Sequence, residues 1–365
     1  MISLYNPYIS ENTLKNVSNC IKQNWISSKG FYVKKFEKLF SKFTKIKYSV
    51  SVSNGTCAMH IALLSLGIKK NDEVIVPSFT YVATVNPIKY VGAKAVFVDS
   101  DLETLQIDTN KIEKKINNKT KAIICPHLYG NIANIEELIR LKKKYNLFLI
   151  EDCAESFGSY YKKKHSGNFG DVATFSFYGN KTITTGEGGM VCTNNKKISK
   201  IAYKLKTQGV VRAKHPYYHD VIGYNYRMTN ICAAIGVSQL QESQFIINQK
   251  RKIFEKYIKK IKLTSKIRIL KESKNVSSSF WLIVIVLKNK TIKNKLEKFL
   301  SKNYIETRPT FYPIHKLPIY YSNKKFKNAE ILGTCGLCLP SYPGIKNSEI
   351  EYISKKINQF FDEIK

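Results

Sequence analysis

The sequence predicts an α/β fold with a mainly parallel central sheet, helices on both faces and a small C-terminal α+β domain. Apolar segments of strand length alternate with helical segments from residue 48 to residue 177, which is typical of a parallel sheet. Polar candidate residues follow these strands directly, at the edge where such sheets bind ligands. Lysine-rich helical sequence begins near residue 245, so we expect a large domain at 1–247 and a smaller one at 248–365.

Helical periodicity and capping residues predict helices before, between and after the strands. The expected helices are 10–23, 31–45, 56–67, 79–90, 108–117, 134–145, 230–241, 243–262, 291–302 and 348–362. The expected strands, rich in β-branched and aromatic residues, are 48–53, 73–77, 95–99, 121–125, 147–152, 172–177, 278–287 and 303–309. The last two strands and the helix between them belong to the C-terminal domain.

Lys181 lies between a hydrophobic strand and a glycine-rich turn. Residues 172–177 are mainly β-branched and aromatic, and residues 186–189 read Gly-Glu-Gly-Gly. Desolvation at such a place would lower the pKa of the amine and give the neutral form that attacks carbonyl groups. An ordinary surface lysine explains this stretch alone equally well, because lysine is abundant throughout the chain.

Two further segments favour a site that works through Lys181. Asp152 ends an apolar run and is placed to hold a protonated pyridine nitrogen, as in enzymes that use pyridoxal phosphate (PLP), although helix capping is the commoner role of such an acid. Residues 48–66 read as a strand, Asn-Gly-Thr and a helix, which is either a phosphate seat at a helix N-terminus or a simple capped turn. Lysine, aspartate and phosphate seat together predict a PLP enzyme.

The chain resembles the DegT/DnrJ/EryC1/StrS family of PLP-dependent sugar aminotransferases, and this resemblance implies the type I aminotransferase fold. The segments that carry it are 53–68, 72–88, 127–131, 151–159, 170–190 and 223–231. They extend over most of the chain. Family members transfer an amino group to a keto sugar that is linked to a nucleotide.

The resemblance implies a role for each matching residue. Lys181 would join the cofactor and move protons, while Asp152 would pair with the ring nitrogen. Glu155 occupies a position at which some relatives have Gln beside the ring hydroxyl, so its role stays open. The remaining cofactor contacts would be Gly55, Thr56 and Ser176 at the phosphate, Tyr81 on the ring, and Asn225 at the phosphate of a partner subunit. Asn225 therefore implies a homodimer with shared active sites.

Contacts to the sugar nucleotide are expected from an irregular loop and from the N-terminal region. The loop reads Thr-Arg-Pro-Thr-Phe-Tyr-Pro-Ile-His, and its arginine suits a diphosphate. These residues could equally serve only to pack the loop. His127 could equally be a structural histidine or a residue that contacts the ligand. The candidates are Arg308, Tyr312 and His315 in the loop, with Trp25 and Ser27 at the entrance.

The function implied by the resemblance is transfer of an amino group from glutamate to a nucleotide-linked 4-keto-6-deoxy hexose. Residues 25–30, 221–236 and 306–320 resemble the subgroup that makes GDP-perosamine. The alternatives are an aminotransferase that makes viosamine from a UDP- or dTDP-linked 4-keto-6-deoxyglucose, a sugar dehydratase, and a binding protein without activity. Dehydratases of this family have histidine in place of the lysine, so Lys181 argues against that alternative.

Composition indicates which classes of partner and which cellular compartment to expect. The formal charge is +33, but arginine occurs at only six positions and the lysines are dispersed, so we expect a lysine-rich surface and no nucleic-acid partner. We expect no signal peptide, because residues 1–7 contain no basic segment and no apolar core, and the longest apolar run, 281–287, is too short for a bilayer. Eight cysteines without framework spacing suggest reduced thiols, hence a cytoplasmic protein. The lone Cys-x-x-Cys at 335–338 predicts no metal site.

Overall fold

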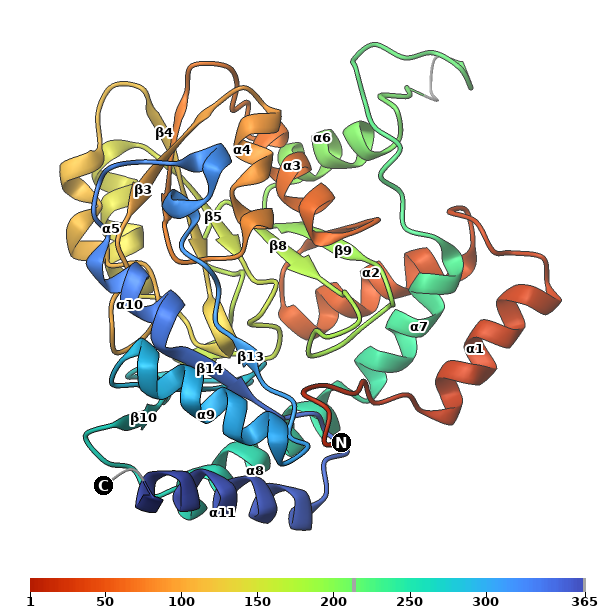
Figure 1. The fold of residues 1–365 in the computed structure, drawn as a ribbon. Coiled ribbons are helices and arrows are strands. Elements are labelled where there is room, and N and C mark those ends of the chain that lie inside the picture. Colours follow the sequence, from red (N-terminus) through yellow and green to blue (C-terminus); the bar gives the residue numbers. More distant parts are fainter. Residues whose placement is uncertain (212–214, 364–365) are drawn as a thin grey trace.

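A seven-stranded sheet forms the centre of the protein in the computed structural model, which describes residues 1–211 and 215–363 (Figure 1). Its strand order is β1-β9-β8-β5-β4-β2-β3, and β9 alone runs antiparallel to its neighbours. The strands are β1 Tyr48–Val52, β2 Glu73–Pro77, β3 Lys94–Val98, β4 Thr120–Pro126, β5 Phe148–Asp152, β8 Val172–Ser176 and β9 Gly189–Thr193. The predicted α/β class with a mainly parallel sheet is confirmed.

Helices cover both faces of this sheet because its strands are apolar on both sides. Val50, Val74 and Ile124 pack on one face, against α3, α4 and α6. Phe175 and Ile123 point to the other face, towards α2, α5 and α7. The helices are α1 Glu11–Lys22, α2 Phe31–Thr44, α3 Gly55–Ser65, α4 Asn86–Tyr90, α5 Ile135–Tyr145, α6 Lys196–Lys206 and α7 Asn230–Gln241.

The C-terminal part contains a second sheet of order β10-β12-β14-β13, which packs with helices around a core of its own. Its elements are α8 Ser243–Lys260, β10 Ile267–Ile269, β12 Ile283–Leu287, α9 Lys290–Lys302, β13 Arg308–Pro309, α10 Lys327–Cys335, β14 Gly336–Leu339 and α11 Asn347–Glu363. A small sheet joins β6 Tyr160–Tyr161, β7 Lys164–His165 and β11 Val276–Ser277. The chain start also reaches this part, since Ile2 bridges Ile305. The division at 247/248 stays a prediction.

Four expected elements are shorter in the structure. Residues 108–117 form two 3₁₀ turns instead of a helix, and the 79–90 helix is reduced to a turn and α4. Pro87 explains the late start of α4, because proline fits the first turn of a helix and not its interior. The expected strands 278–287 and 303–309 retain only β12 and β13, since positive φ angles at Phe280 and Tyr304 interrupt extended backbone.

Several elements had no counterpart in the sequence prediction. They are β6, β7, β9, β10, β11, β14, α6 and α10. Among the described residues, no helix combines the length and the apolar character needed to cross a membrane.

Candidate active site

A cavity of about 550 Å³ opens at the carboxyl ends of β4, β5 and β8, next to the first turn of α3. Lys181, Asp152 and Glu155 all line it. This is the edge at which parallel sheets of this class bind ligands. The structure therefore brings together the lysine, the aspartate and the phosphate seat that the sequence placed in separate segments.

The Lys181 amine is buried at one wall of this cavity. Its side chain is 13% exposed, and Nζ lies 3.7 Å from Glu155 Oε1. The N–H of Lys181 donates to the Tyr178 carbonyl, so a turn directly after β8 fixes where the side chain begins. Burial lowers the pKa of Lys181, and the negative charges of Glu155 and Asp152 only partly oppose this. The neutral form of the Lys181 amine is therefore more favoured in this site than it would be in water.

Glu155 is the most perturbed acid of the cavity. Burial raises its pKa from 4.5 to about 7, although the nearby Lys181 charge acts in the opposite direction. Its Oε2 accepts a hydrogen bond of 2.9 Å from the backbone N–H of Tyr129. Tyr129 has a φ of 57°, which a bulky residue rarely adopts and which directs this N–H at the carboxylate. Burial thus shifts both Glu155 and Lys181 towards their uncharged forms.

Asp152 ends β5 and is oriented by two donors. The Thr84 hydroxyl donates to Oδ2 over 2.7 Å, and the Ala154 N–H donates to Oδ1 over 3.1 Å. The residue is half-buried at the floor of the cavity. A carboxylate fixed in this way is suited to pair with a cationic N–H group.

The N-terminus of α3 is the predicted phosphate seat, and it opens on the cavity. Asn54 caps the helix by accepting from the Cys57 N–H at 2.9 Å, and the N–H groups of the first turn have no partner within the helix. Gly55 approaches Ser176 so closely that an added Cβ would lie 2.8 Å from the Ser176 Cβ. Gly55, Thr56 and Ser176 all line the cavity. Their placement suits a phosphate group.

Aromatic rings form another wall. Tyr129 stacks on Trp281 and on Phe311, with centroid distances of 5.9 and 5.3 Å, and Phe311 contacts Tyr81 at 5.6 Å. Tyr81, the predicted ring contact, lines the cavity with its side chain exposed. Trp281 and Tyr129 were not predicted as site residues. Trp281 was expected in the strand 278–287, and Tyr129 was expected just after the strand 121–125, so only the fold brings the two rings together at the cavity.

Of the three predicted sugar contacts in the loop, the structure places only Arg308 at the cavity. Arg308 lines the cavity, whereas Tyr312 is exposed outside its lining. His315 is fully buried, and its ring nitrogens lie within hydrogen-bond distance of Ser78 and, at 3.1 Å, of Glu330. These partners occupy both nitrogens, so the geometry gives His315 a structural place behind the cavity. A sugar contact through His315 or Tyr312 has no support from this single chain.

Three predicted residues lie outside the cavity of their own chain. Asn225 is exposed, and its Oδ1 accepts hydrogen bonds from Arg227. Trp25 and Ser27 lie between α1 and α2, where both are exposed. None of the three belongs to the cavity lining. Their predicted roles require a second subunit.

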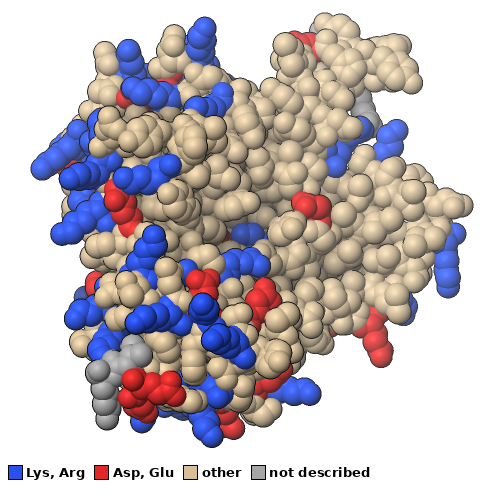
Figure 2. All heavy atoms as spheres, in the orientation of Figure 1, with Lys and Arg blue, Asp and Glu red and all other residues tan. Residues whose placement is uncertain are grey.

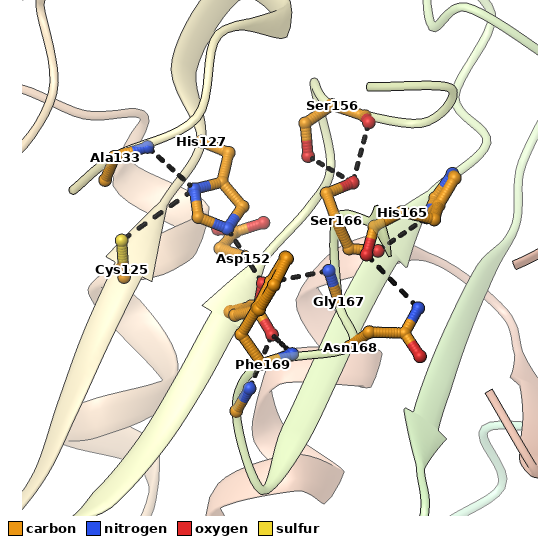
Figure 3. Close-up of polar contacts among 12 residues, drawn as sticks. Cys125, His127, Ala133, Asp152, Ser156, His165, Ser166, Gly167, Asn168 and Phe169 are labelled. Carbon is orange, nitrogen blue, oxygen red and sulfur yellow. Dashed lines mark hydrogen bonds and ion pairs between the residues drawn. The ribbon is translucent and has the colours of Figure 1, made fainter. Parts of the chain in front are cut away.

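His127 is buried at the lining of the cavity, and its ring takes part in a network of buried hydrogen bonds (Figure 3). Its Nε2 is 3.0 Å from Glu151 Oε2, and its Nδ1 lies 3.3 Å from the Ala133 N–H. Glu151 also accepts from the N–H groups of Gly167, Phe169 and Gly170. His127, Glu151 and Cys153 lie close enough to suit a metal, but these bonds already use the His127 nitrogens and the Glu151 oxygens. The network fixes β5 beside the loop 167–170.

The fold and the cavity place the chain in a class of α/β enzymes with a buried lysine at the carboxyl edge of the sheet. Comparisons with known proteins then give the family. The model of the DegT/DnrJ/EryC1/StrS aminotransferase family matches residues 7–358. The chain therefore belongs to this family, and the resemblance found in the sequence is confirmed.

Two curated relatives are similar over their full lengths. GDP-perosamine synthase of Escherichia coli O157:H7 is 49% identical over 363 residues, which is 99% of each chain. GDP-perosamine synthase of Vibrio cholerae is 44% identical over 367 residues, 99% of this chain and 100% of that protein. Among solved structures, E. coli GDP-4-keto-6-deoxy-D-mannose-3-dehydratase with bound hydrated PLP has a TM-score of 0.91 at 27% identity, covering 98% of this chain and 100% of that one.

Proposed function

We propose that this protein is a PLP-dependent aminotransferase that converts GDP-4-keto-6-deoxymannose to GDP-perosamine, with glutamate as amino donor. Two relatives named GDP-perosamine synthase match 99% of this chain at 49% and 44% identity, which supports GDP-perosamine as the product. The observation that carries the chemistry is the buried Lys181 amine, 3.7 Å from Glu155, in a cavity that also contains Asp152.

The residues of the cavity fit PLP. The first turn of α3, with Gly55, Thr56 and the Ser176 hydroxyl, would hold the phosphate, since Gly55 leaves room where a Cβ would meet Ser176. Asp152 would pair with the ring nitrogen and Tyr81 would cover the ring. PLP, when bound, supplies an electron-accepting ring that stabilises a carbanion on the carbon bearing the nitrogen.

The protein's own groups would orient the reactants and move the protons. Lys181 would bind the cofactor through Nζ and, once released, carry a proton between the cofactor carbon and the substrate carbon. A lowered pKa increases the share of neutral amine, which is the form that can accept a proton. Asp152, held by Thr84 and Ala154, would keep a proton on the ring nitrogen by charge. Glu155, with a pKa of about 7, would exchange a proton with groups near Lys181.

Arg308 would bind the anionic part of the substrate. It lines the same cavity as Lys181, and its guanidinium suits a diphosphate through two parallel hydrogen bonds. The aromatic wall of Tyr129, Phe311 and Tyr81 would exclude water beside the hexose. Glutamate and the sugar nucleotide would use this cavity in turn.

A second copy of the chain would complete each site. The side of the molecule with α1 and α7 shows few charged side chains (Figure 2). Exposed apolar side chains in and next to these elements and in residues 215–222 are Trp25, Ile26, Phe31, Tyr217 and Ile222. Elsewhere Figure 2 shows lysines dispersed among acidic residues. Exposed apolar side chains gathered on one face support a subunit interface. A homodimer would bring Asn225 to the partner's phosphate, and Trp25 and Ser27 to its entrance. The eight cysteines are all free, which supports a cytoplasmic location.

The experiment that tests the substrate compares specificity constants for GDP-4-keto-6-deoxymannose with those for UDP- and dTDP-4-keto-6-deoxyglucose. We expect a clear preference for the GDP sugar, because a site built for one hydroxyl arrangement leaves buried groups unpaired with the other, at about 1–3 kcal/mol per group. Preference for a glucose-derived substrate would make viosamine the product and leave the aminotransferase reaction in place. Conversion of the GDP sugar without gain of nitrogen would identify a dehydratase.

A further inference from the structure

Lys181 is held by two side chains that are distant from it in the sequence. The Tyr5 hydroxyl donates a hydrogen bond to the Lys181 carbonyl, and Trp281 Nε1–H donates to the Asn180 carbonyl over 2.6 Å. These two carbonyls belong to the peptide groups on either side of the Lys181 Cα. The bonds therefore restrain the backbone of Lys181 in a segment whose glycines restrain it little.

The indole that holds this backbone also contacts the amine. Lys181 Nζ lies 4.1 Å from the centroid of the Trp281 ring, and Trp281 is 3% exposed. Attraction between an ammonium group and an indole face is stronger where water is excluded. The ring thus favours the charged amine, whereas burial favours the neutral one. One side chain thereby affects both the direction and the charge of Lys181.

Lys250 of α8 holds Trp281 from behind. Its Nζ donates to the Trp281 carbonyl and to the Ser341 carbonyl, each over 3.0 Å, and lies 5.1 Å from the Tyr5 ring. The side chain is 1% exposed, and burial lowers its pKa to about 7. Both acceptors are neutral carbonyls, so no carboxylate in these bonds offsets the cost of burying the charge. Lys250 thus joins α8 to the Trp281 and Ser341 segments and lies beside Tyr5.

We propose that Trp281 is a positioning residue for Lys181 and that Lys250 acts on Lys181 through Trp281. The inference rests on the proposed function, in which Lys181 is the reacting amine. Trp281 holds the Lys181 backbone through Nε1–H and keeps Nζ over its ring, facing the cavity. Lys250 fixes the Trp281 backbone, so that the indole contacts both the Asn180 carbonyl and Lys181 Nζ.

Trp281→Phe separates this role from simple packing, because it keeps a ring but removes Nε1–H and weakens the attraction for the ammonium group. The measurement is acetylation of Lys181 by acetic anhydride in the full-length protein without cofactor, read by peptide mass spectrometry across pH. We expect the pKa of Lys181 to fall by about half a unit, roughly a threefold change in its protonation equilibrium. In the loaded enzyme we expect kcat to fall about tenfold with the KM for glutamate within about twofold.

Phe254→Leu is the matched control. Phe254 stacks on Phe280, the neighbour of Trp281, with a centroid distance of 3.9 Å, so its loss loosens the same segment without touching Lys181. We expect the Lys181 titration to be unchanged in this variant. Lys250→Met tests the support without altering the aromatic core. Lys250→Met should lower the pKa of Lys181, as Trp281→Phe does. The double variant should show little further decrease beyond that of Trp281→Phe, because both changes act through Trp281.

Two results would overturn the proposal. One is an unchanged Lys181 titration and kcat in both Trp281→Phe and Lys250→Met, and the other is an equal change in Trp281→Phe and Phe254→Leu. Acetylation does not depend on transamination, so the two proposals fail separately. If the Lys181 titration shifts as expected while the cofactor attaches to another lysine, the proposed function is wrong and the positioning of Lys181 stands.

Discussion

Glu155→Gln is expected to remove a pH dependence from the stability of the protein without cofactor. Glu155 is 5% exposed, and its pKa rises from 4.5 to about 7 because burial disfavours the charged form. The folded state thus binds this proton more tightly than the unfolded state. The stabilising contribution is fully present below pH 4.5 and is lost as the pH rises to about 7. The shift corresponds to roughly 3 kcal/mol of unfolding free energy.

Glutamine has the same shape, stays neutral and keeps an oxygen for the Tyr129 N–H. Urea unfolding of wild type and Glu155→Gln should therefore give free energies that diverge as the pH rises from 4.5 to about 7, by up to about 3 kcal/mol in favour of the variant. Glu187→Gln is the matched control, because Glu187 lines the same cavity with its side chain exposed, and it shows what removal of an exposed carboxylate alone does to stability. Parallel pH profiles for wild type and Glu155→Gln would refute the reasoning.

Three further substitutions test the other parts of the cavity. Asp152→Asn should lower kcat by about 10²- to 10³-fold, because it removes a carboxylate fixed by Thr84 and Ala154, and near-normal turnover would contradict the pairing. Gly55→Ala should weaken PLP binding at least about tenfold in equilibrium dialysis, because its Cβ would lie 2.8 Å from the Ser176 Cβ, and unchanged affinity would exclude this seat. Arg308→Gln should raise the KM for the sugar nucleotide about tenfold or more, with partial recovery in Arg308→Lys, and an unchanged KM would place the diphosphate elsewhere.

The helix that begins at Gly55 and the strand-end positions of Lys181 and Asp152 could be predicted because their signals are local. A strand that ends in Asn-Gly-Thr before an apolar helix puts free N–H groups at one edge of the sheet, whichever tertiary contacts follow. The alternation of strands and helices likewise indicates the edge at which Lys181 and Asp152 meet.

Other features depend on partners that are distant in the sequence. His315 lies in a polar, proline-rich loop typical of ligand sites, but Ser78 and Glu330 occupy its ring nitrogens. Trp281 read as part of a core strand, whereas the positive φ of Phe280 delays β12 and leaves the indole free to meet Lys181. Such contacts follow from packing, which periodicity does not report.

We propose Lys181 as the reacting amine of a PLP-dependent aminotransferase. Borohydride reduction of the protein with bound PLP, followed by peptide mass spectrometry, tests it most directly, and Lys181→Ala serves as the control that should retain the fold and lose transamination. We expect a pyridoxyl group on Lys181 in wild type and no specific label in the variant. A pyridoxyl group on any other lysine, or transamination that persists in Lys181→Ala, would contradict this proposal.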